Sequence, residues 1–210
     1  MDERMSERRG GAPPSETTST ISDEDWYARE FGGAEYSDVR FVDIDLTEAS
    51  NSGATFTNCV FVNVKFNVSS HESTAFVNCT FRGCNFFDAT FTGCKLIGSI
   101  FDSCDFSILK VHGGDWSFTG FRRAELQGVE FTGVRLREAD FTNARCARST
   151  FAGCDFSGSV LHGADFADAD LRGSALGEID PLTVNLRGAS VTGDQAAEIA
   201  RGLGLVVDEV

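Results

Sequence analysis

Large apolar residues recur at every fifth position of the chain from Phe31 to Val191, without a change of phase. This spacing defines 33 positions, of which 30 hold Phe, Leu or another apolar residue; the exceptions are Asn51, His71 and Pro181. A helix repeats every 3.6 residues and a strand alternates with period two, so neither explains a period of five. A short fixed period is typical of a solenoid, in which each unit packs only on its neighbours.

A second series, two positions before each large residue, holds small side chains. Its members include Ala34, Ala49, Ala54, Cys59, Cys79, Cys84, Ala89, Cys94 and Ala164. A small residue beside each large one lets both point into a coil and fill it without voids. The repeating unit is therefore small, any, large apolar, any, any.

Units such as 164–168, 169–173 and 124–128 resemble the A(D/N)LXX units of pentapeptide repeat proteins, and the resemblance covers about 160 of the 210 residues. It implies an all-β fold, a right-handed quadrilateral parallel β-helix with four units in each coil. The repeats then make about eight coils, stacked about 4.8 Å apart into a rod roughly 40 Å long. A short C-terminal helix follows the solenoid.

The first residues depart from the repeat. Residues 1–22 are rich in Ser, Thr, Gly, Glu and Arg, which predicts a disordered N-terminal arm. The β-helix is expected over 23–191 and needs a cap, because an open solenoid end leaves strand edges unpaired. Ser22 and Asp25 fit a capping box, and Trp26 is suited to cover the first coil.

Residues 192–210 are expected to hold a helix and a strand. Asp194 can cap a helix over 195–201, and the apolar run 203–207 predicts a strand. This segment is either a lid on the last coil or a contact that pairs two chains tail to tail. The candidate dimerisation residues are Ala196, Ile199, Ala200, Leu203, Leu205 and Val207.

The formal net charge is −14, and residues 31–191 hold 20 acidic and 13 basic residues, a net −7. Because four five-residue units make one coil, residues 20 apart are expected to lie above one another on the same side of the rod. This count places seven acidic residues on a single side, the candidate partner-binding face: Asp45, Glu48, Asp88, Asp105, Glu125, Asp165 and Asp168. Lys65, Arg145, Arg148 and Arg187 share that side, which leaves it at −3. No continuous basic stripe exists, which disfavours direct nucleic-acid binding. Acidity alone also keeps a rod soluble.

No catalytic, cofactor or metal motif stands out in the sequence. Six of the seven cysteines occupy small inward sites and Cys146 a large one, so they are expected to be buried free thiols, which suit a reducing cytoplasm. His71 lies one coil after Asn51 on the same side, so a hydrogen bond between them in the core is expected. The sequence contains no run of about 18 apolar residues, which a membrane-spanning helix would need. Residues 1–20 lack the apolar stretch of a secretory signal.

The end of the chain, at 180–181, 186–189, 194–196 and 202–203, resembles MfpA-type proteins of the quinolone-resistance group. That resemblance implies a cytoplasmic, non-enzymatic homodimer that acts on DNA gyrase as a DNA mimic, modulating it or protecting it from quinolones or a toxin. A structural or scaffolding repeat protein with another protein partner remains the alternative. An enzyme would need an ordered pocket with a reactive group, which the repeats do not provide.

Overall fold

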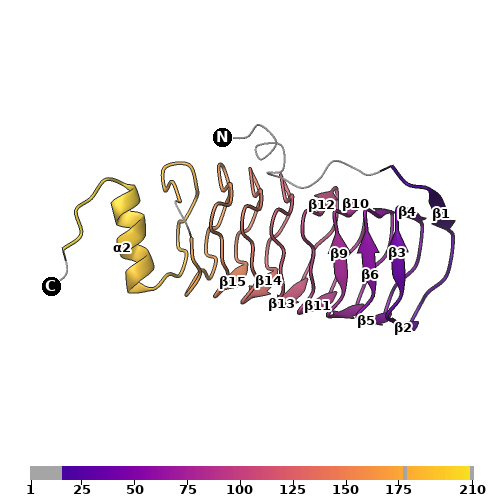
Figure 1. Ribbon diagram of the computed structural model, residues 1–210. Coiled ribbons are helices and arrows are strands. Elements are labelled where there is room, and N and C mark those ends of the chain that lie inside the picture. The colour runs from indigo at the N-terminus through magenta and orange to yellow at the C-terminus, as the bar shows by residue number, and fades with distance from the viewer. Residues whose placement is uncertain (1–15, 177–178, 209–210) are drawn as a thin grey trace.

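The computed structural model describes residues 16–176 and 179–208. They form a rod of stacked coils with one helix, α2 (Gly193–Gly202), across its C-terminal end (Figure 1). The coils make a parallel β-solenoid of about seven turns. The all-β, quadrilateral β-helix expected from the five-residue period is therefore confirmed. Residues 1–15 of the expected N-terminal arm (1–22) lie outside the described residues.

Short parallel strands, each one side of a coil, build the rod. In chain order they are β1 (Ser19–Ser22), β2 (Glu30–Gly32), β3 (Glu35–Ser37), β4 (Val39–Val42), β5 (Ser50–Ser52), β6 (Thr55–Thr57), β7 (Val60–Val62), β8 (Ser70–Glu72), β9 (Ala75–Val77), β10 (Thr80–Arg82), β11 (Thr90–Thr92), β12 (Ile100–Asp102), β13 (Lys110–His112), β14 (Glu130–Thr132) and β15 (Thr150–Ala152). They pair in three sheets, in the orders β1-β4-β7-β10-β12, β2-β5-β8-β11-β13-β14-β15 and β3-β6-β9. Isolated parallel bridges, such as Asp45 with Lys65, form the fourth side. Partners are usually 20 residues apart, for example Phe81 with Phe101, which is the length of one coil.

The chain turns at its corners through the left-handed backbone region. Every fifth residue of the repeats takes a positive φ there, as at Asp43 (54°), Asn63 (54°) and Gly83 (60°) along one corner. Asp, Asn and Gly tolerate this region better than other residues, because their short or absent side chains avoid the neighbouring carbonyl. Such corners let five residues complete one side of a square.

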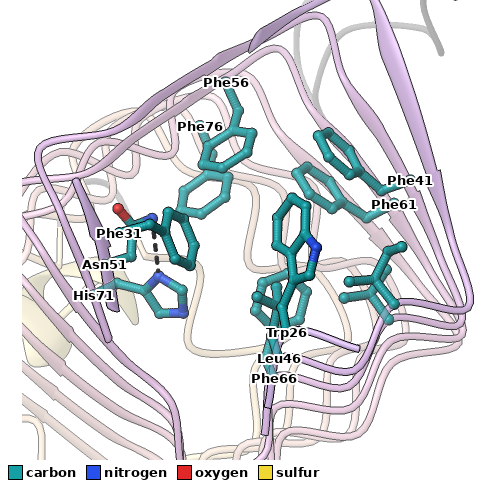
Figure 2. Close-up of a pocket in the computed structure, with 12 residues that line it drawn as sticks. Trp26, Phe31, Phe41, Leu46, Asn51, Phe56, Phe61, Phe66, His71 and Phe76 are labelled. Carbon is teal, nitrogen blue, oxygen red and sulfur yellow. Dashed lines mark hydrogen bonds between the residues drawn. The ribbon is translucent and has the colours of Figure 1, made fainter. Parts of the chain in front are cut away.

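The large residues of the five-residue series fill the interior as vertical stacks of rings. Phe41, Phe61 and Phe81 stack with centroids 4.9 and 4.8 Å apart and nearly parallel planes. Phe56 and Phe76 stack likewise on the next side, and Figure 2 shows both files pointing inward. Each ring is almost fully buried. Burying one Phe contributes roughly 1.5–3 kcal/mol, so these files are the main source of stability.

The solenoid begins earlier than the expected boundary at residue 23. Strand β1 ends at Ser22, and Asp25 bridges to Asp45, so no helical capping box forms there. Ile21 and Trp26 continue the five-residue phase back from Phe31, and Trp26 is buried with an edge-on contact to Phe31. Trp26 therefore takes an inward site of the first coil.

The coil path is disturbed near the C-terminal end. At 180–183 the amide of Thr183 bonds to the carbonyl of Asp180, and Leu182 is 81 % exposed. Pro181, expected in the inward series, is only partly buried, and Ile179 and Val184 fill the space instead. The coils continue beyond this turn, because Asp165 still bridges to Asn185 and Asp170 to Ser190.

Helix α2 starts one residue after Thr192, which caps it in place of the expected Asp194. Thr192 and Gln195 form a reciprocal capping box, because each side chain satisfies the other's backbone amide. The expected strand over 203–207 is wrong: within 205–208 the chain is irregular, and Gly204 takes a positive φ of 81°. This segment forms no β-bridge with any other described residue.

Candidate partner-binding surface

The structure brings the seven predicted acidic residues to one side of the rod. Four of them, Asp45, Asp105, Glu125 and Asp165, share one vertical row. Backbone bridges run along this row from Asp45 to Asp105 and again from Glu125 to Asp165. The other three acidic residues on this side take the adjacent corner: Glu48, Asp88 and Asp168, each with a positive φ. The count from the coil length thus predicts the neighbours correctly; a role for them in binding remains a prediction.

Ion pairs neutralise part of this face. Lys65 Nζ lies 3.0 Å from Asp45 Oδ2, and Lys110 Nζ lies 2.6 Å from Asp88 Oδ1. Glu125 Oε1 lies 3.4 Å from Nη1 of Arg145, one coil further along the row. Such exposed pairs contribute little stability, with a median of about 0–1 kcal/mol, but each removes one free negative charge from the face.

The carboxylates in the row are also held in place by their own backbone. Asp45, Asp105 and Asp165 each accept a hydrogen bond from the amide two residues further on, at 2.9–3.1 Å. Partial burial raises the pKa of Asp45, but bonds from Thr47 and the ammonium of Lys65 outweigh burial and hold that pKa below its usual value. The row therefore presents carboxylate oxygens in fixed orientations.

Four acidic residues of the face remain outside any ion pair among the described residues: Glu48, Asp105, Asp165 and Asp168. Asp165 and Asp168 share one coil, so these free charges occur about three coils apart along the rod, which is roughly 14 Å per step. Duplex DNA carries about one charge per 1.7 Å of axis. The face therefore matches DNA in sign and in its linear form, at a much lower charge density.

The hydrogen bonding between coils is interrupted at one place on this side within residues 16–176. Every other pair of successive coils is joined here, for example from Val68 N to Phe87 O at 2.8 Å and from Asp88 N to Ser107 O at 3.0 Å. No backbone hydrogen bond or bridge joins 103–108 to 122–127. Cys104, inside this gap, is the one cysteine that is not fully buried. The two coils are thus not joined by backbone hydrogen bonds beside Asp105.

A row of exposed apolar side chains lies on the same side of the rod. The face predicted from the sequence contained only charged residues and did not include this row. Tyr27, Val68, Phe87 and Ile108 are 54, 47, 42 and 48 % exposed. The only other large apolar residues with comparable exposure among the described residues are at the C-terminal end, from Leu182 onward. Two features of the sequence indicate this exposed row: Phe87 lies outside the inward five-residue series, and Val68 and Ile108 fall on corner positions, which face outward. A hydrogen bond with Glu48 raises the pKa of the Tyr27 phenol, which ties the row to the acidic face.

The C-terminal end combines a docked helix with exposed apolar residues. Gln195, buried in α2, donates to the carbonyls of Leu171 and Ser174, both at 2.7 Å, which ties the helix to the last coil. Ile199 and Ala200 are half-buried, and Ala196 is exposed. Beyond the helix, Leu203, Leu205 and Val206 are exposed, and Val207 is half-buried. Part of the predicted dimerisation set therefore serves as a lid, and the rest faces solvent.

Three polar residues of the core, Asn51, Ser69 and His71, bond to one another, although Asn51 Oδ1 has no hydrogen-bond partner among the described residues. Asn51 Nδ2 lies 3.5 Å from His71 Nδ1, as expected, and Ser69 Oγ lies 3.0 Å from His71 Nε2 (Figure 2 shows the Asn51 contact). Ser69 Oγ also donates to Phe66 O at 2.7 Å, so the ring is neutral with its proton on Nε2. Full burial lowers the pKa of His71 to about 3. The group is a structural core cluster, since Asn51 and His71 are each only 2 % exposed and the imidazole stacks on Phe91.

The cysteines are free, and burial raises the pKa of Cys94 and Cys154 to about 11. Their thiols donate to backbone carbonyls, as Cys94 does to His71 O at 3.3 Å. Within 16–176 and 179–208, no group of three or more His, Cys, Asp or Glu is arranged to hold a metal ion. No helix in those ranges is long and apolar enough to cross a membrane.

Residues 84–161 match the family model described as the pentapeptide repeat region. No protein of curated function matches the chain by sequence. Two solved structures of trypsin-treated variants of QnrB1, a plasmid-mediated fluoroquinolone resistance protein, share the fold. They reach TM-scores of 0.69 and 0.57 at 21 and 18 % identity, and each match covers 91 % of this chain and 96 % of the other. These findings confirm the resemblance to pentapeptide repeat proteins, and at such identities the likeness to QnrB1 is one of fold.

Proposed function

We propose that this pentapeptide repeat rod is a non-enzymatic DNA mimic that binds DNA gyrase in the cytoplasm and modulates it or protects it from quinolones or a toxin. The observation that carries the proposal is the linear acidic face, with Glu48, Asp105 and Asp168 free of ion pairs among the described residues, along a rod of regular coils. Solved structures with the same fold include QnrB1, described as a plasmid-mediated fluoroquinolone resistance protein. The tail's resemblance to MfpA-type proteins points to the same group.

The electrostatics favour a partner whose natural ligand is DNA. A groove that binds duplex DNA is lined by basic side chains, and it attracts any long, narrow, negatively charged body. The face offers fixed carboxylates for this purpose, because Asp45, Asp105 and Asp165 are oriented by backbone amides. Its lower charge density predicts weaker salt dependence than DNA shows for the same groove.

We also propose that two copies join through their C-terminal ends. The exposed Leu203, Leu205 and Val206, together with Leu182, place apolar side chains where a monomer would leave them in water. A two-fold contact between these ends would cover both sets at once. It would also lengthen the acidic rod, which suits a partner that binds an extended stretch of duplex.

A supercoiling assay tests the gyrase proposal. Purified protein is titrated into gyrase and relaxed plasmid, with and without a fluoroquinolone. The proposal expects a change in supercoiling, or a loss of drug-induced cleavage, at micromolar protein. No effect of either kind at that concentration would remove gyrase as the partner.

The ion pairs on the face favour a second candidate, a scaffold for a protein that does not bind DNA. Lys65 and Arg145 interrupt the negative row, which a close copy of DNA would not need. A scaffold would bind its partner with little dependence on Glu48, Asp105 and Asp168. Charge reversal at these three positions, followed by the supercoiling assay, therefore separates the two functions.

A further inference from the structure

Exposed apolar side chains are concentrated along one corner of the rod, together with acidic ones. We define the corner ridge as Tyr27, Glu48, Val68, Phe87, Asp88 and Ile108. The backbone fixes this order: Glu48 N donates to Asn67 O at 2.9 Å, Val68 N to Phe87 O at 2.8 Å, and Asp88 N to Ser107 O at 3.0 Å. Successive coils therefore place the members of the ridge about 4.8 Å apart along the rod.

Two members of the ridge are unusual residues for their backbone conformation. Val68 and Ile108 take φ values of 57° and 53°. In β-branched residues this left-handed conformation is a genuine outlier, because the branched side chain crowds the backbone. Val68 and Ile108 are the only β-branched residues at this corner among the described residues; the others are Ala28, Glu48, Asp88, Gly128, Arg148, Asp168 and Gly188. Both strained residues are also about half exposed, so neither backbone preference nor burial explains why they occupy these positions.

Strain of this kind persists where a function requires it. The interrupted hydrogen bonding between 103–108 and 122–127 lies at the Ile108 end of the same ridge. The ridge therefore combines exposed apolar surface, two strained residues and an interruption of the hydrogen bonds between coils. These features together indicate a surface that contacts another molecule.

The charges around the ridge identify the kind of partner. Asp45 and Asp88 are paired with Lys65 and Lys110, whereas Glu48 and Asp105 have no ion pair among the described residues. These two acids bracket the apolar residues, about three coils or roughly 14 Å apart. The rim is net negative, so it repels nucleic acid, an anionic lipid surface and a second copy of itself. It attracts a protein surface with an apolar centre between two basic side chains.

We propose that the corner ridge is the contact through which the acidic face binds its protein partner, with Val68, Phe87 and Ile108 packing against apolar side chains that two basic residues flank. This inference rests on the proposed function and makes gyrase the partner. In that binding mode the acidic row supplies the resemblance to DNA, and the ridge supplies contacts that DNA lacks. A few apolar anchors usually dominate the binding energy of such an interface.

The test uses the full chain and purified gyrase. Val68→Asn with Ile108→Asn removes the apolar side chains and supplies a residue that tolerates the left-handed region. We expect the Kd for gyrase to rise at least about tenfold, as loss of anchor residues does at other interfaces, while the thermal midpoint stays the same or rises. Phe118→Asn is the matched control, because Phe118 has a φ of 60° on another corner of the rod; this variant is expected to bind as the wild type does. Glu48→Gln with Asp105→Asn is expected to weaken binding and to reduce its salt dependence.

Each result decides between the possibilities. An unchanged Kd in the Val68→Asn, Ile108→Asn variant, with an active wild type, would overturn the ridge alone. A fall in its thermal midpoint would also overturn it, because the two residues would then serve the fold. If this variant changes its oligomeric state but binds gyrase unchanged, the ridge is a contact between copies of the chain. If the wild type binds labelled duplex DNA and the variant does not, the ridge is a nucleic-acid site. Either result contradicts the proposal. If the wild type does not affect gyrase at all, the proposed function fails first.

Discussion

Replacement of His71 by Phe should abolish a specific acid sensitivity of the fold. His71 is fully buried with a pKa lowered to about 3, whereas in the unfolded chain the imidazole has its ordinary value of about 6.5. The unfolded state therefore binds a proton below about pH 6.5 that the folded state does not bind. Stability from this residue is present above that pH and is lost progressively as the pH falls toward 3.

The size of the effect follows from the two pKa values. Between pH 7 and pH 5 the linkage lowers the free energy of unfolding by about 2 kcal/mol, and between pH 7 and pH 3 by about 4 kcal/mol. The carboxylates of Asp45, Asp115, Asp155 and Asp170, with pKa values below the usual range, titrate mainly below this window. The interval from pH 7 to pH 5 therefore isolates the histidine.

The assay is urea denaturation of the wild type and the His71→Phe variant at pH 7 and at pH 5, with their free energies of unfolding compared. The introduced phenyl ring would stack on Phe91, whose ring lies 4.6 Å from the imidazole, but Asn51 would lose its partner. The variant is therefore expected to be less stable at pH 7. The difference between the two proteins should shrink by about 2 kcal/mol at pH 5. A difference that stays constant between the two pH values would refute the buried neutral histidine.

The remaining predictions concern packing, backbone and assembly. Phe106→Ala should cost roughly 3–5 kcal/mol in the free energy of unfolding by leaving a cavity, whereas Asp105→Lys should change it by less than about 0.5 kcal/mol; equal losses in chemical denaturation would contradict the inward and outward assignment. Gly114→Ala should lower the thermal midpoint more than Gly113→Ala, because both have positive φ but only the first would press a Cβ against the Cys94 carbonyl; equal midpoints would argue against that contact. Leu203→Asp should convert a dimer to a monomer in light scattering without unfolding the rod, and a dimer that persists would exclude this end as the contact.

The sequence predicts the interior well because each inward position is encoded directly. The stack of Phe41, Phe61 and Phe81 follows from counting in fives, and the register of 20 residues follows from four units per coil. The start of the rod is less visible, since Ile21 and Trp26 keep the phase but stand among Ser, Asp and Thr residues. Their inward positions emerge only from pairing with the next coil.

The C-terminal end shows what local patterns omit. The apolar run 203–207 has the composition of a strand, yet a strand needs a partner edge, and none reaches this segment within the described residues. The helix was predictable, but its cap depends on the reciprocal bonds of Thr192 and Gln195. A buried glutamine that bonds to two carbonyls of the last coil cannot be read from the helix alone.

The candidate surface was predicted in part. The sequence places the acidic residues on one side, because this count needs only the coil length. It does not show which of them pair, since the ion pair of Asp88 with Lys110 joins side chains 22 residues apart, in adjacent rows. Nor does it show the strain at Val68 and Ile108, because the sign of φ depends on where the corners fall.

Competition between this protein and duplex DNA for gyrase is the decisive measurement for DNA mimicry. Labelled duplex DNA is bound to purified gyrase, and the protein is titrated in while the bound fraction of DNA is followed. A DNA mimic displaces the DNA, so we expect displacement by the wild type and none by a Glu48→Lys, Asp105→Lys, Asp168→Lys variant with an intact fold. A complex in which gyrase holds the protein and the DNA together, each with unchanged Kd, would contradict DNA mimicry.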